Sequence, residues 1–346
     1  MNHSTTLSVV IGSYAQSNQT GIYMGQFAAA SGTLTLTATH SGISNPSFVI
    51  GHPNGRWLYA VSETREGQVW ALQWDGETLQ PLNYQTSGGD DPCHLQLDET
   101  GQWLAVANYS SGSVTVLPIR PDGSLGEMTS HVQHSGHGPQ TQRQEKAHAH
   151  STLFTPDNQG LLVADLGIDA VVRYAFAAAT GHLSLQGQTV SRPGAGPRHM
   201  AFDRRGRILY VANELDNTVA VYHHAQGVLQ AQQTIDTIPP GALANTVAHI
   251  QLSPDGERVY VSNRGHDSVA MFAAAADGQL TSLATRSCGG ACPRHFTLSP
   301  DGRFLLVANQ NSHNVAVLST GDRPEKSGDT VGNLPIAQAS CVQFIP

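Results

Sequence analysis

Charged and imidazole side chains recur at two positions of a pattern that repeats along this chain of 346 residues. A guanidinium group binds a carboxylate or a phosphate at two points, and a histidine beside a glutamate can move protons near neutral pH. Charged residues are only 13% of the chain, against about 25% in an average soluble protein, so a gathering of them indicates chemistry. The candidates are His150, Arg198 and Arg294 at one position of the pattern, and Glu63, Glu214 and Arg264 at the other.

Each of these residues also has a structural interpretation, because polar side chains at repeat positions often hydrogen-bond loop backbone and tie neighbouring units together. Recurrence of one residue type favours that interpretation at the next position of the pattern. The histidines there are His94, His199, His249 and His295. Of these, His199 is kept as a candidate for contact with a substrate.

The elements that would position these residues are short strands in a repeated unit. Four segments, which begin at Pro92, Pro197, Val247 and Pro293, share an apolar strand, a turn with Asp and Gly, a second apolar strand that ends in Asn, and a third, alternating strand. Further copies begin at Asn45 and His148, and each unit has a more variable fourth strand. Four strands in a unit of roughly 40 to 50 residues are typical of a β-propeller blade.

The two ends of the chain together supply a seventh unit. Residues 341–346 match a first strand, and residues 8–14, 21–27 and 33–39 match the second, third and fourth strands. A blade made from both termini leaves no open sheet edge in the ring. The sequence therefore predicts an all-β fold, a single seven-bladed β-propeller over residues 1–346 with four-stranded antiparallel blades, and a long His-rich loop at about 121–147 between blades.

Alignment of the units brings the candidate residues to one place. The start of each first strand and the end of each second strand lie at the same mouth of the central channel, because neighbouring strands run antiparallel. His148 and Lys146, from the loop that precedes His150, are further candidates there.

Composition and charge exclude several kinds of partner. The net charge is −8 and no block of five basic residues occurs, so we exclude nucleic acid as the main partner. No run approaches 18 apolar residues, and the first residues lack the features of a signal peptide, so we expect no membrane association and a cytoplasmic location. We expect the four cysteines to remain thiols there, and the protein to be a monomer or a weak homo-oligomer.

Two groups of residues could suggest a metal site, but their spacing does not support one. Cys288 and Cys292 are not a C-x2-C pair, and no second pair follows. The histidines around the long loop lack carboxylates at coordinating intervals; they are His131, His134, His137, His148 and His150. We therefore predict neither a metal nor a cofactor.

Motifs around these residues resemble the seven-bladed propeller lactonase family. They are the run Gly194-Ala-Gly-Pro-Arg-His-Met200, the Asn213-Glu214-Leu215 that follows it, His150-Ser151 before it and Ser262-Asn-Arg264 after it. The family includes bacterial propeller-type 6-phosphogluconolactonases and carboxy-muconate lactonizing enzymes, and the resemblance covers essentially the whole chain. One departure is that the segment before His150 is expanded into the His-rich loop, which leaves open whether His148 or His150 faces the substrate.

The resemblance implies hydrolysis of a sugar δ-lactone, 6-phosphogluconolactone to 6-phosphogluconate, a step of the pentose phosphate pathway. It implies active-site roles for His150, Arg198, Glu214 and Arg264. The reaction needs a positioned water, a base, and positive groups near the carbonyl oxygen. We expect Glu214 or His150 to be the base, and Arg198 with Arg264 to hold the oxyanion or the substrate anion. Further substrate-binding candidates are Glu63, Lys146, His148, His199 and Arg294, of which Lys146 and Arg294 suit the phosphate.

Three other points follow from the residues. No G-x-S-x-G motif is present, so we expect no acyl-enzyme. A first alternative is a cyclase or lactonase that acts on a dicarboxylate such as a muconate, with the same arginines on carboxylates. A second is a non-catalytic propeller that binds peptides, although the Trp-Asp and Gly-His signatures of such repeats are absent from the strand ends.

Overall fold

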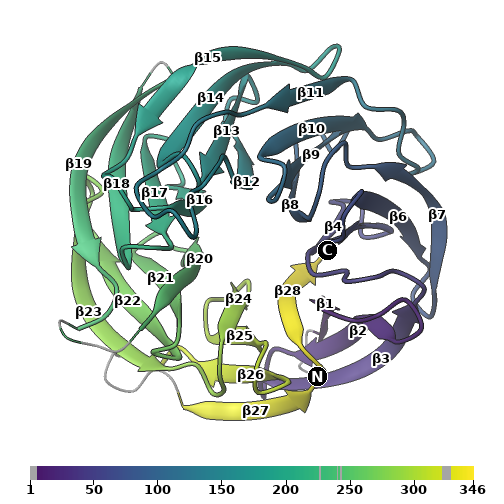
Figure 1. Ribbon diagram of the computed structural model, residues 1–346. Coiled ribbons are helices and arrows are strands. Elements are labelled where there is room, and N and C mark those ends of the chain that lie inside the picture. The colour runs from purple at the N-terminus through teal and green to yellow at the C-terminus, as the bar shows by residue number, and fades with distance from the viewer. Residues whose placement is uncertain (1–5, 226, 240, 242–243, 322–328) are drawn as a thin grey trace.

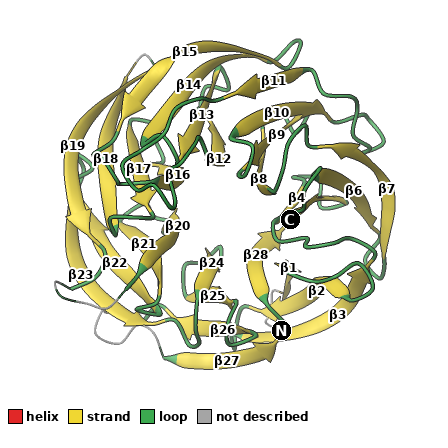
Figure 2. Ribbon diagram, in the orientation of Figure 1, coloured by secondary structure: helices red, strands yellow, loops and turns green. Residues whose placement is uncertain are grey.

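The computed structural model describes residues 6–225, 227–239, 241, 244–321 and 329–346. They form seven four-stranded antiparallel sheets, the blades, around a central channel (Figure 1). Figure 2 shows strands and loops only, and no helix occurs among the described residues. The predicted all-β, seven-bladed propeller is therefore confirmed.

Blade 1 joins the two ends of the chain. Its strands, from the channel outward, are β28 (Ala339–Ile345), β1 (Thr6–Ser13), β2 (Thr20–Ala28) and β3 (Thr33–Ser41). Strand β28 pairs with β1 in antiparallel register, with Ser8 opposite Ile345 and Gly12 opposite Cys341. The expected closure of the ring by both termini is what the structure shows (Figure 1).

The other six blades follow in chain order. Blade 2 contains β4 (Val49–Gly51), β5 (Trp57–Ser62), β6 (Gln68–Trp74) and β7 (Leu79–Thr86); blade 3 contains β8 (Pro92–Leu97), β9 (Trp103–Asn108), β10 (Ser113–Pro118) and β11 (Ser130–Gln133). Blade 4 contains β12 (Ala149–Phe154), β13 (Gly160–Asp165), β14 (Ala170–Ala177) and β15 (His182–Val190); blade 5 contains β16 (Pro197–Phe202), β17 (Ile208–Asn213), β18 (Thr218–Ala225) and β19 (Val228–Asp236). Blade 6 contains β20 (Thr246–Leu252), β21 (Arg258–Arg264), β22 (Ser268–Ala274) and β23 (Leu280–Ser287); blade 7 contains β24 (Pro293–Leu298), β25 (Phe304–Asn309), β26 (Asn314–Ser319) and β27 (Thr330–Pro335).

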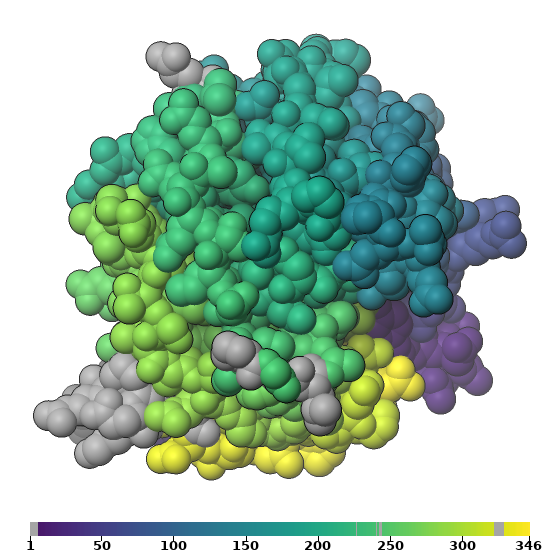
Figure 3. Space-filling model, turned by 60° about the vertical axis from the view of Figure 1, so that its left-hand side comes forward, coloured from purple at the N-terminus to yellow at the C-terminus, as the bar shows by residue number. Residues whose placement is uncertain are grey.

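The hydrophobic core is divided into layers between neighbouring blades. Each apolar cluster draws almost all its residues from two adjacent blades, for example blades 3 and 4 or blades 5 and 6. Second strands such as β17 are buried along their whole length, because blades cover both faces, whereas the outermost β19 is exposed or half-buried at every residue but Leu229. Seen from the side, successive blades stand against one another in chain order (Figure 3).

Tight turns join the first and second strands of blades 2 to 7, whereas in blade 1 these two strands are the two ends of the chain. In blade 3 the Asp98 carboxylate accepts hydrogen bonds from the backbone N–H groups of Gln102 and Trp103, and Gly101 has a φ of +69°. Asn158 takes the left-handed position in blade 4, with a φ of +56°. These turns fix the length of each first strand and so place its opposite end at the channel mouth.

One part of the long segment expected as a loop at 121–147 is a strand. Residues Ser130–Gln133 form β11, the outermost strand of blade 3, which pairs with β10. Its sequence, Ser-His-Val-Gln, shows little apolar alternation because this short edge covers little of the core. The irregular connection is therefore residues 134–148. No helix of the described residues is long and apolar enough to cross a membrane.

Candidate active site

Irregularities in the innermost strands direct the candidate side chains into the channel mouth. In blade 5 the register passes from Pro197 to His199, so that Arg198 has no partner on β17. A β-bulge leaves its extra residue unpaired and re-aims the side chain. The same irregularity occurs at Cys93, His150, Arg294 and Ser340. These bulges bring the residues at the start of the first strands, among them His150, Arg198 and Arg294, toward one site.

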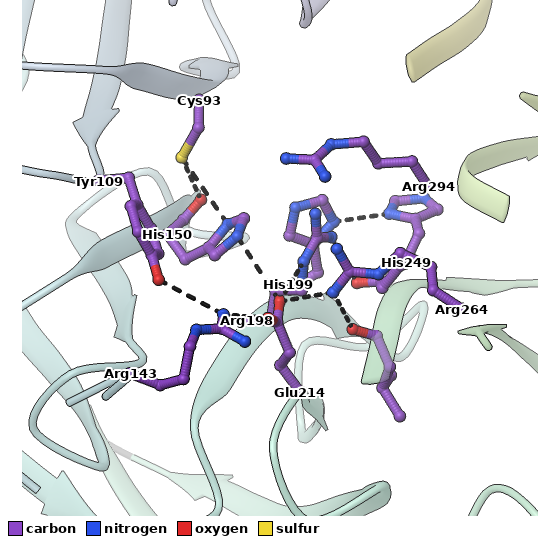
Figure 4. Close-up of polar contacts among 12 residues, drawn as sticks. Cys93, Tyr109, Arg143, His150, Arg198, His199, Glu214, His249, Arg264 and Arg294 are labelled. Atoms are coloured by element: carbon purple, nitrogen blue, oxygen red, sulfur yellow. Dashed lines mark hydrogen bonds and ion pairs between the residues drawn. The ribbon is translucent and has the colours of Figure 1, made fainter. Parts of the chain in front are cut away.

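Glu214 is the centre of this site. It directly follows β17, and its side chain is 3% exposed. Its Oε2 atom lies 3.0 Å from Nε of Arg198 and 2.7 Å from Nη2 of Arg264, and its Oε1 atom lies 2.5 Å from Nη2 of Arg143. Figure 4 shows the three guanidinium groups gathered around the carboxylate. Three cations thus share one buried anion.

Charge dominates the ionisation of this cluster. Burial raises the pKa of Glu214, but Arg264, Arg198 and the other cations outweigh burial and hold the pKa well below its usual range. Burial and then Arg264 lower the pKa of Arg198 to about 9, so that its side chain is still charged at neutral pH. The site therefore carries more positive than negative charge at pH 7.

His150 lies beside Glu214 without a direct hydrogen bond to it. Its Nε2 atom is 3.9 Å from Glu214 Oε2, and its Nδ1 atom is 3.7 Å from the Sγ atom of Cys93. Burial, and next the charge of Arg198, lower the pKa of His150 well below its usual value. The imidazole is neutral at physiological pH and has a ring nitrogen on the side of the Glu214 carboxylate (Figure 4).

Glu63 and Arg294 form a second group in the same mouth. The hydroxyl of Tyr14 donates to the Glu63 carboxylate at 2.9 Å, and Ser47 Oγ also donates to it. The Arg294 guanidinium lies over the ring of Tyr14, 5.1 Å from its centre. Burial raises the pKa of Glu63, and Arg294 opposes this only in part. Glu63 and Arg294 line one narrow recess together with Cys93, His150 and Arg198, so that Arg198 lies between this recess and Glu214.

The histidines that directly follow the bulge residues in the first strands form a floor below this recess. His199 and His249 are joined by a hydrogen bond between their Nδ1 atoms at 2.8 Å, and His249 stacks on His295 at 3.9 Å between ring centres. His94 and Phe48 continue this group, which we call the imidazole floor. Beyond it the channel opens into a cavity of about 470 Å³.

The burial of the floor keeps its rings neutral. Burial is the first cause of a lowered pKa in each ring, with the charge of Arg198 or of neighbouring histidines next, and the pKa is about 3 for His94 and for His295. His199 lines the recess and is hydrogen-bonded to His249 within this floor. Its role as a substrate-binding residue stays a prediction.

Two loop candidates lie apart from the cluster. His148 stacks on Tyr109, with its Nδ1 atom 3.0 Å from the Tyr109 carbonyl oxygen and its Nε2 atom 3.2 Å from Glu145. Lys146 is exposed, and no ion pair among the described residues joins it to Glu214. The geometry thus favours His150 over His148 as the histidine that faces the site.

Arg143 is the site residue that sequence reasoning missed. It lies in the 134–148 connection, and its guanidinium reaches Glu214 and the hydroxyl of Tyr109. Because this connection has no counterpart in the other blades, alignment of the repeats could not place it. The only signal was a basic residue in a polar loop that enters the mouth.

Comparison with known proteins gives one consistent result. A model of the family described as "Lactonase, 7-bladed beta-propeller" matches residues 8–344. The chain is 36% identical over 293 residues to a 6-phosphogluconolactonase of Bacillus subtilis, and the aligned region covers 83% of each chain. It is 33% identical over 288 residues to a 6-phosphogluconolactonase of Formosa agariphila, which covers 80% of this chain and 82% of that one.

A solved structure shares the fold over its whole length. The periplasmic gluconolactonase of Pseudomonas aeruginosa superposes with a TM-score of 0.92 at 33% sequence identity, and 99% of each chain is covered. The similarity therefore extends to every blade.

Proposed function

This chain belongs to the seven-bladed β-propeller lactonase family, and from that membership we propose that it hydrolyses 6-phosphoglucono-1,5-lactone to 6-phosphogluconate. Two of its relatives are named 6-phosphogluconolactonase, and a third is a gluconolactonase. A sugar lactone is thus the substrate class, and the names favour lactone hydrolysis over both a cyclase acting on a muconate and a non-catalytic scaffold.

The observation that favours a phosphorylated substrate is the excess of positive charge in the mouth of the channel. Four arginines converge there, and Glu214 is the shared partner of Arg143, Arg198 and Arg264. Buried cations without matching anions are costly, unless a ligand supplies the missing negative charge. A phosphate dianion does so, and arginine binds phosphate in two-point fashion.

We propose that the attacking water lies between His150 and Glu214. The 3.9 Å between Nε2 and Oε2 is too long for a direct hydrogen bond, but both atoms can reach one water molecule. His150 is neutral and takes the proton as water attacks the lactone carbonyl carbon. Glu214, which stays ionised, then stabilises the imidazolium that forms.

The arginines would act on the developing negative charge. Arg198 Nη1 donates to the Ala248 carbonyl oxygen at 2.6 Å, and Arg264 Nη2 donates to that of Val247 at 2.9 Å. Both groups are thereby held before the substrate arrives, as stabilisation of an oxyanion requires. When the tetrahedral intermediate collapses, the ring C–O bond breaks, and the ring oxygen takes the proton back from His150 to become a hydroxyl.

This function would place the protein in the cytoplasm. All four cysteines are unpaired, which suits a reducing compartment. The reaction as proposed uses cationic side chains where other hydrolases use a metal, so we expect full activity in the presence of a chelator.

A panel of three substrates tests the proposal. The purified protein is given freshly made 6-phosphoglucono-1,5-lactone, glucono-1,5-lactone and a carboxy-muconate, and the rate above spontaneous hydrolysis is measured in chelator. We expect the largest kcat/KM for the phosphorylated lactone. Preference for the carboxy-muconate, or no activity on any of the three, would contradict the proposal.

A further inference from the structure

Arg143 differs from Arg198 and Arg264 in how it is held. Its side chain is 40% exposed, against 3% for Arg198 and 13% for Arg264. Arg198 and Arg264 each donate to a backbone carbonyl oxygen as well as to Glu214. The contacts of the Arg143 guanidinium are with two side chains, Glu214 at 2.5 Å and the Tyr109 hydroxyl at 3.5 Å. Of these three groups, Arg143 is therefore the one that can turn away from Glu214 without losing a bond to the main chain.

The main chain beneath Arg143 is firmly anchored. The neighbouring Gln144 is fully buried, and its Nε2 atom donates to the Leu166 carbonyl oxygen at 2.8 Å and to Asp169 Oδ1 at 2.7 Å. Further back in the same connection, His134 lies 2.6 Å from Asp165 in a buried pair. These contacts fix the segment that carries Arg143, so its freedom is confined to the side chain.

Asp169 also ties this segment to the turn that precedes Arg198. Its carboxylate accepts hydrogen bonds from the backbone N–H groups of Gly194 at 2.6 Å and Gly196 at 2.8 Å. Gln140 adds a bond from its Nε2 atom to the Gly194 carbonyl oxygen at 3.0 Å. The base of Arg143 and the strand that carries Arg198 thus form one rigid unit.

We propose that Arg143 is the phosphate-binding residue of this site, and that it exchanges the Glu214 carboxylate for the phosphate of the substrate. In the free protein the Arg143 guanidinium lies on Oε1 of Glu214. When the phosphorylated lactone enters, the guanidinium turns to the phosphate, and Oε1 loses one cation. The inference rests on the proposed function and deepens it, since it names the residue that distinguishes phosphorylated from unphosphorylated lactones.

Charge and exposure both favour this exchange. A phosphate monoester carries nearly two negative charges at neutral pH, so it competes well with a single carboxylate for a guanidinium. The phosphate is the most strongly hydrated end of the substrate and suits the half-exposed rim, whereas the lactone carbonyl group must approach His150 and Glu214. Arg143 is one of the cations that hold the pKa of Glu214 low, so its departure makes the carboxylate a better partner for the imidazolium of His150.

The first test compares selectivity. For wild type and Arg143→Gln, the ratio of kcat/KM for 6-phosphogluconolactone to kcat/KM for gluconolactone is measured. Loss of a charge-assisted bond to the phosphate should lower this ratio about 10- to 100-fold. Arg303→Gln, which removes an exposed charge paired with Asp301 outside the site, should leave the ratio unchanged. Lys146→Gln is measured beside it, because Lys146 is the loop residue that the sequence indicated for the phosphate.

A second test examines the exchange itself. Phosphite dianion, added with unphosphorylated gluconolactone, should draw Arg143 from Glu214 and accelerate hydrolysis by the wild type, and this activation should be lost in Arg143→Gln. Absence of activation in the wild type would overturn the exchange, even if the selectivity ratio fell.

Other outcomes of these measurements distinguish a failure of the Arg143 inference from a failure of the proposed function. An equal loss on both lactones in Arg143→Gln would show that Arg143 acts only through Glu214, which overturns the inference and leaves the proposed function standing. A fall of the ratio in Lys146→Gln, with Arg143→Gln unaffected, would overturn it as well. A wild type that hydrolyses neither lactone would overturn the proposed function, and this inference with it.

Discussion

The Nε atom of Arg198 lies 3.0 Å from Oε2 of Glu214, and each side chain is only 3% exposed. The two residues come from the bulge of β16 and from the end of β17, which are neighbouring strands of blade 5. Such a buried pair is stable only while both charges are present, because desolvation of a lone ion costs more than the protein can otherwise recover. The pair therefore links the stability of the mouth to its chemistry.

Glu214→Gln should destabilise the fold more than Arg198→Gln. The first change leaves the guanidinium groups of Arg198 and Arg264 without their anion, whereas the second leaves Glu214 two other arginines. We expect losses of about 3 to 5 kcal/mol and about 1 to 3 kcal/mol in the free energy of unfolding. Urea denaturation of both variants and of the double variant measures the coupling; additivity within about 0.5 kcal/mol would contradict a direct interaction.

The pH dependence of kcat/KM should report His150. Burial and Arg198 lower the pKa of this imidazole, so it stays neutral and able to accept a proton well below pH 6.5. We expect kcat/KM for unphosphorylated glucono-1,5-lactone, which has no phosphate that titrates in this range, to be constant from about pH 8 to about pH 6 and to fall only in more acidic solution. A fall centred near pH 6.5 would indicate an exposed histidine as the base instead.

Variants of His150 and His148 complete this test. His150→Gln should lower kcat about 10²- to 10⁴-fold, as expected for loss of a general base. His148→Gln should have a much smaller effect, because His148 bonds to Tyr109 and Glu145 at the edge of the site. Equal losses in both variants would refute the choice of His150.

The imidazole floor should make the fold sensitive to acid. His94 and His295 have a pKa of about 3 in the fold and about 6.5 when unfolded, so the unfolded chain binds more protons between these values. Stability from these residues is complete above pH 6.5 and is lost as the pH falls through that window. Each histidine adds about 1.4 kcal/mol per pH unit to the slope.

His295→Phe tests this effect, because another blade already has a phenylalanine at the corresponding position. Phe48 occupies the equivalent position in blade 2 and packs beside His295 at 5.5 Å between ring centres. We expect the slope of unfolding free energy against pH, between about pH 6 and pH 4, to fall by about 1.4 kcal/mol per pH unit, which is the effect of one proton. An unchanged slope would mean that His295 is not neutral in the fold.

Gly167→Ala should disturb the segment that carries Arg143. A Cβ atom at this position would lie 1.9 Å from the Lys146 carbonyl oxygen and 2.7 Å from the His148 backbone nitrogen, so the backbone must move. We expect a loss of about 1 to 3 kcal/mol in stability and a higher KM for the phosphorylated lactone. Gly332→Ala is the matched control, since its Cβ would meet Val317 at an ordinary 3.4 Å; equal effects of the two changes would contradict the prediction.

The repeat made most of the fold predictable from the sequence. Apolar strands recur in every blade and the turn residues recur in six of them, and the match between residues 341–346 and the first strands predicted how the ring closes. Local pattern was insufficient for β11, a polar strand whose pairing with β10 is a tertiary property. The blades and their order therefore followed from periodicity, and this edge strand did not.

The candidate site was predictable only where it belongs to the repeat. Alignment indicated that His150, Arg198, Glu214 and Arg264 come from one mouth, but it could not show the bulges that turn Arg198 inward while His199 still faces the channel. A bulge is defined by the register between two strands and leaves no distinct residue pattern. Arg143 lies outside the repeat, so its place on Glu214 required the three-dimensional structure.

The kcat/KM of Arg198→Gln for freshly made 6-phosphoglucono-1,5-lactone tests most directly whether the arginines around Glu214 act in catalysis. Arg303→Gln, which alters an exposed arginine paired with Asp301, serves as the control for net charge. If the buried arginines around Glu214 stabilise the oxyanion, Arg198→Gln should lose at least about 10²-fold while the control keeps the wild-type value. If Arg198→Gln is folded and its kcat/KM lies within about twofold of that of the control, the arginines around Glu214 do not stabilise the oxyanion.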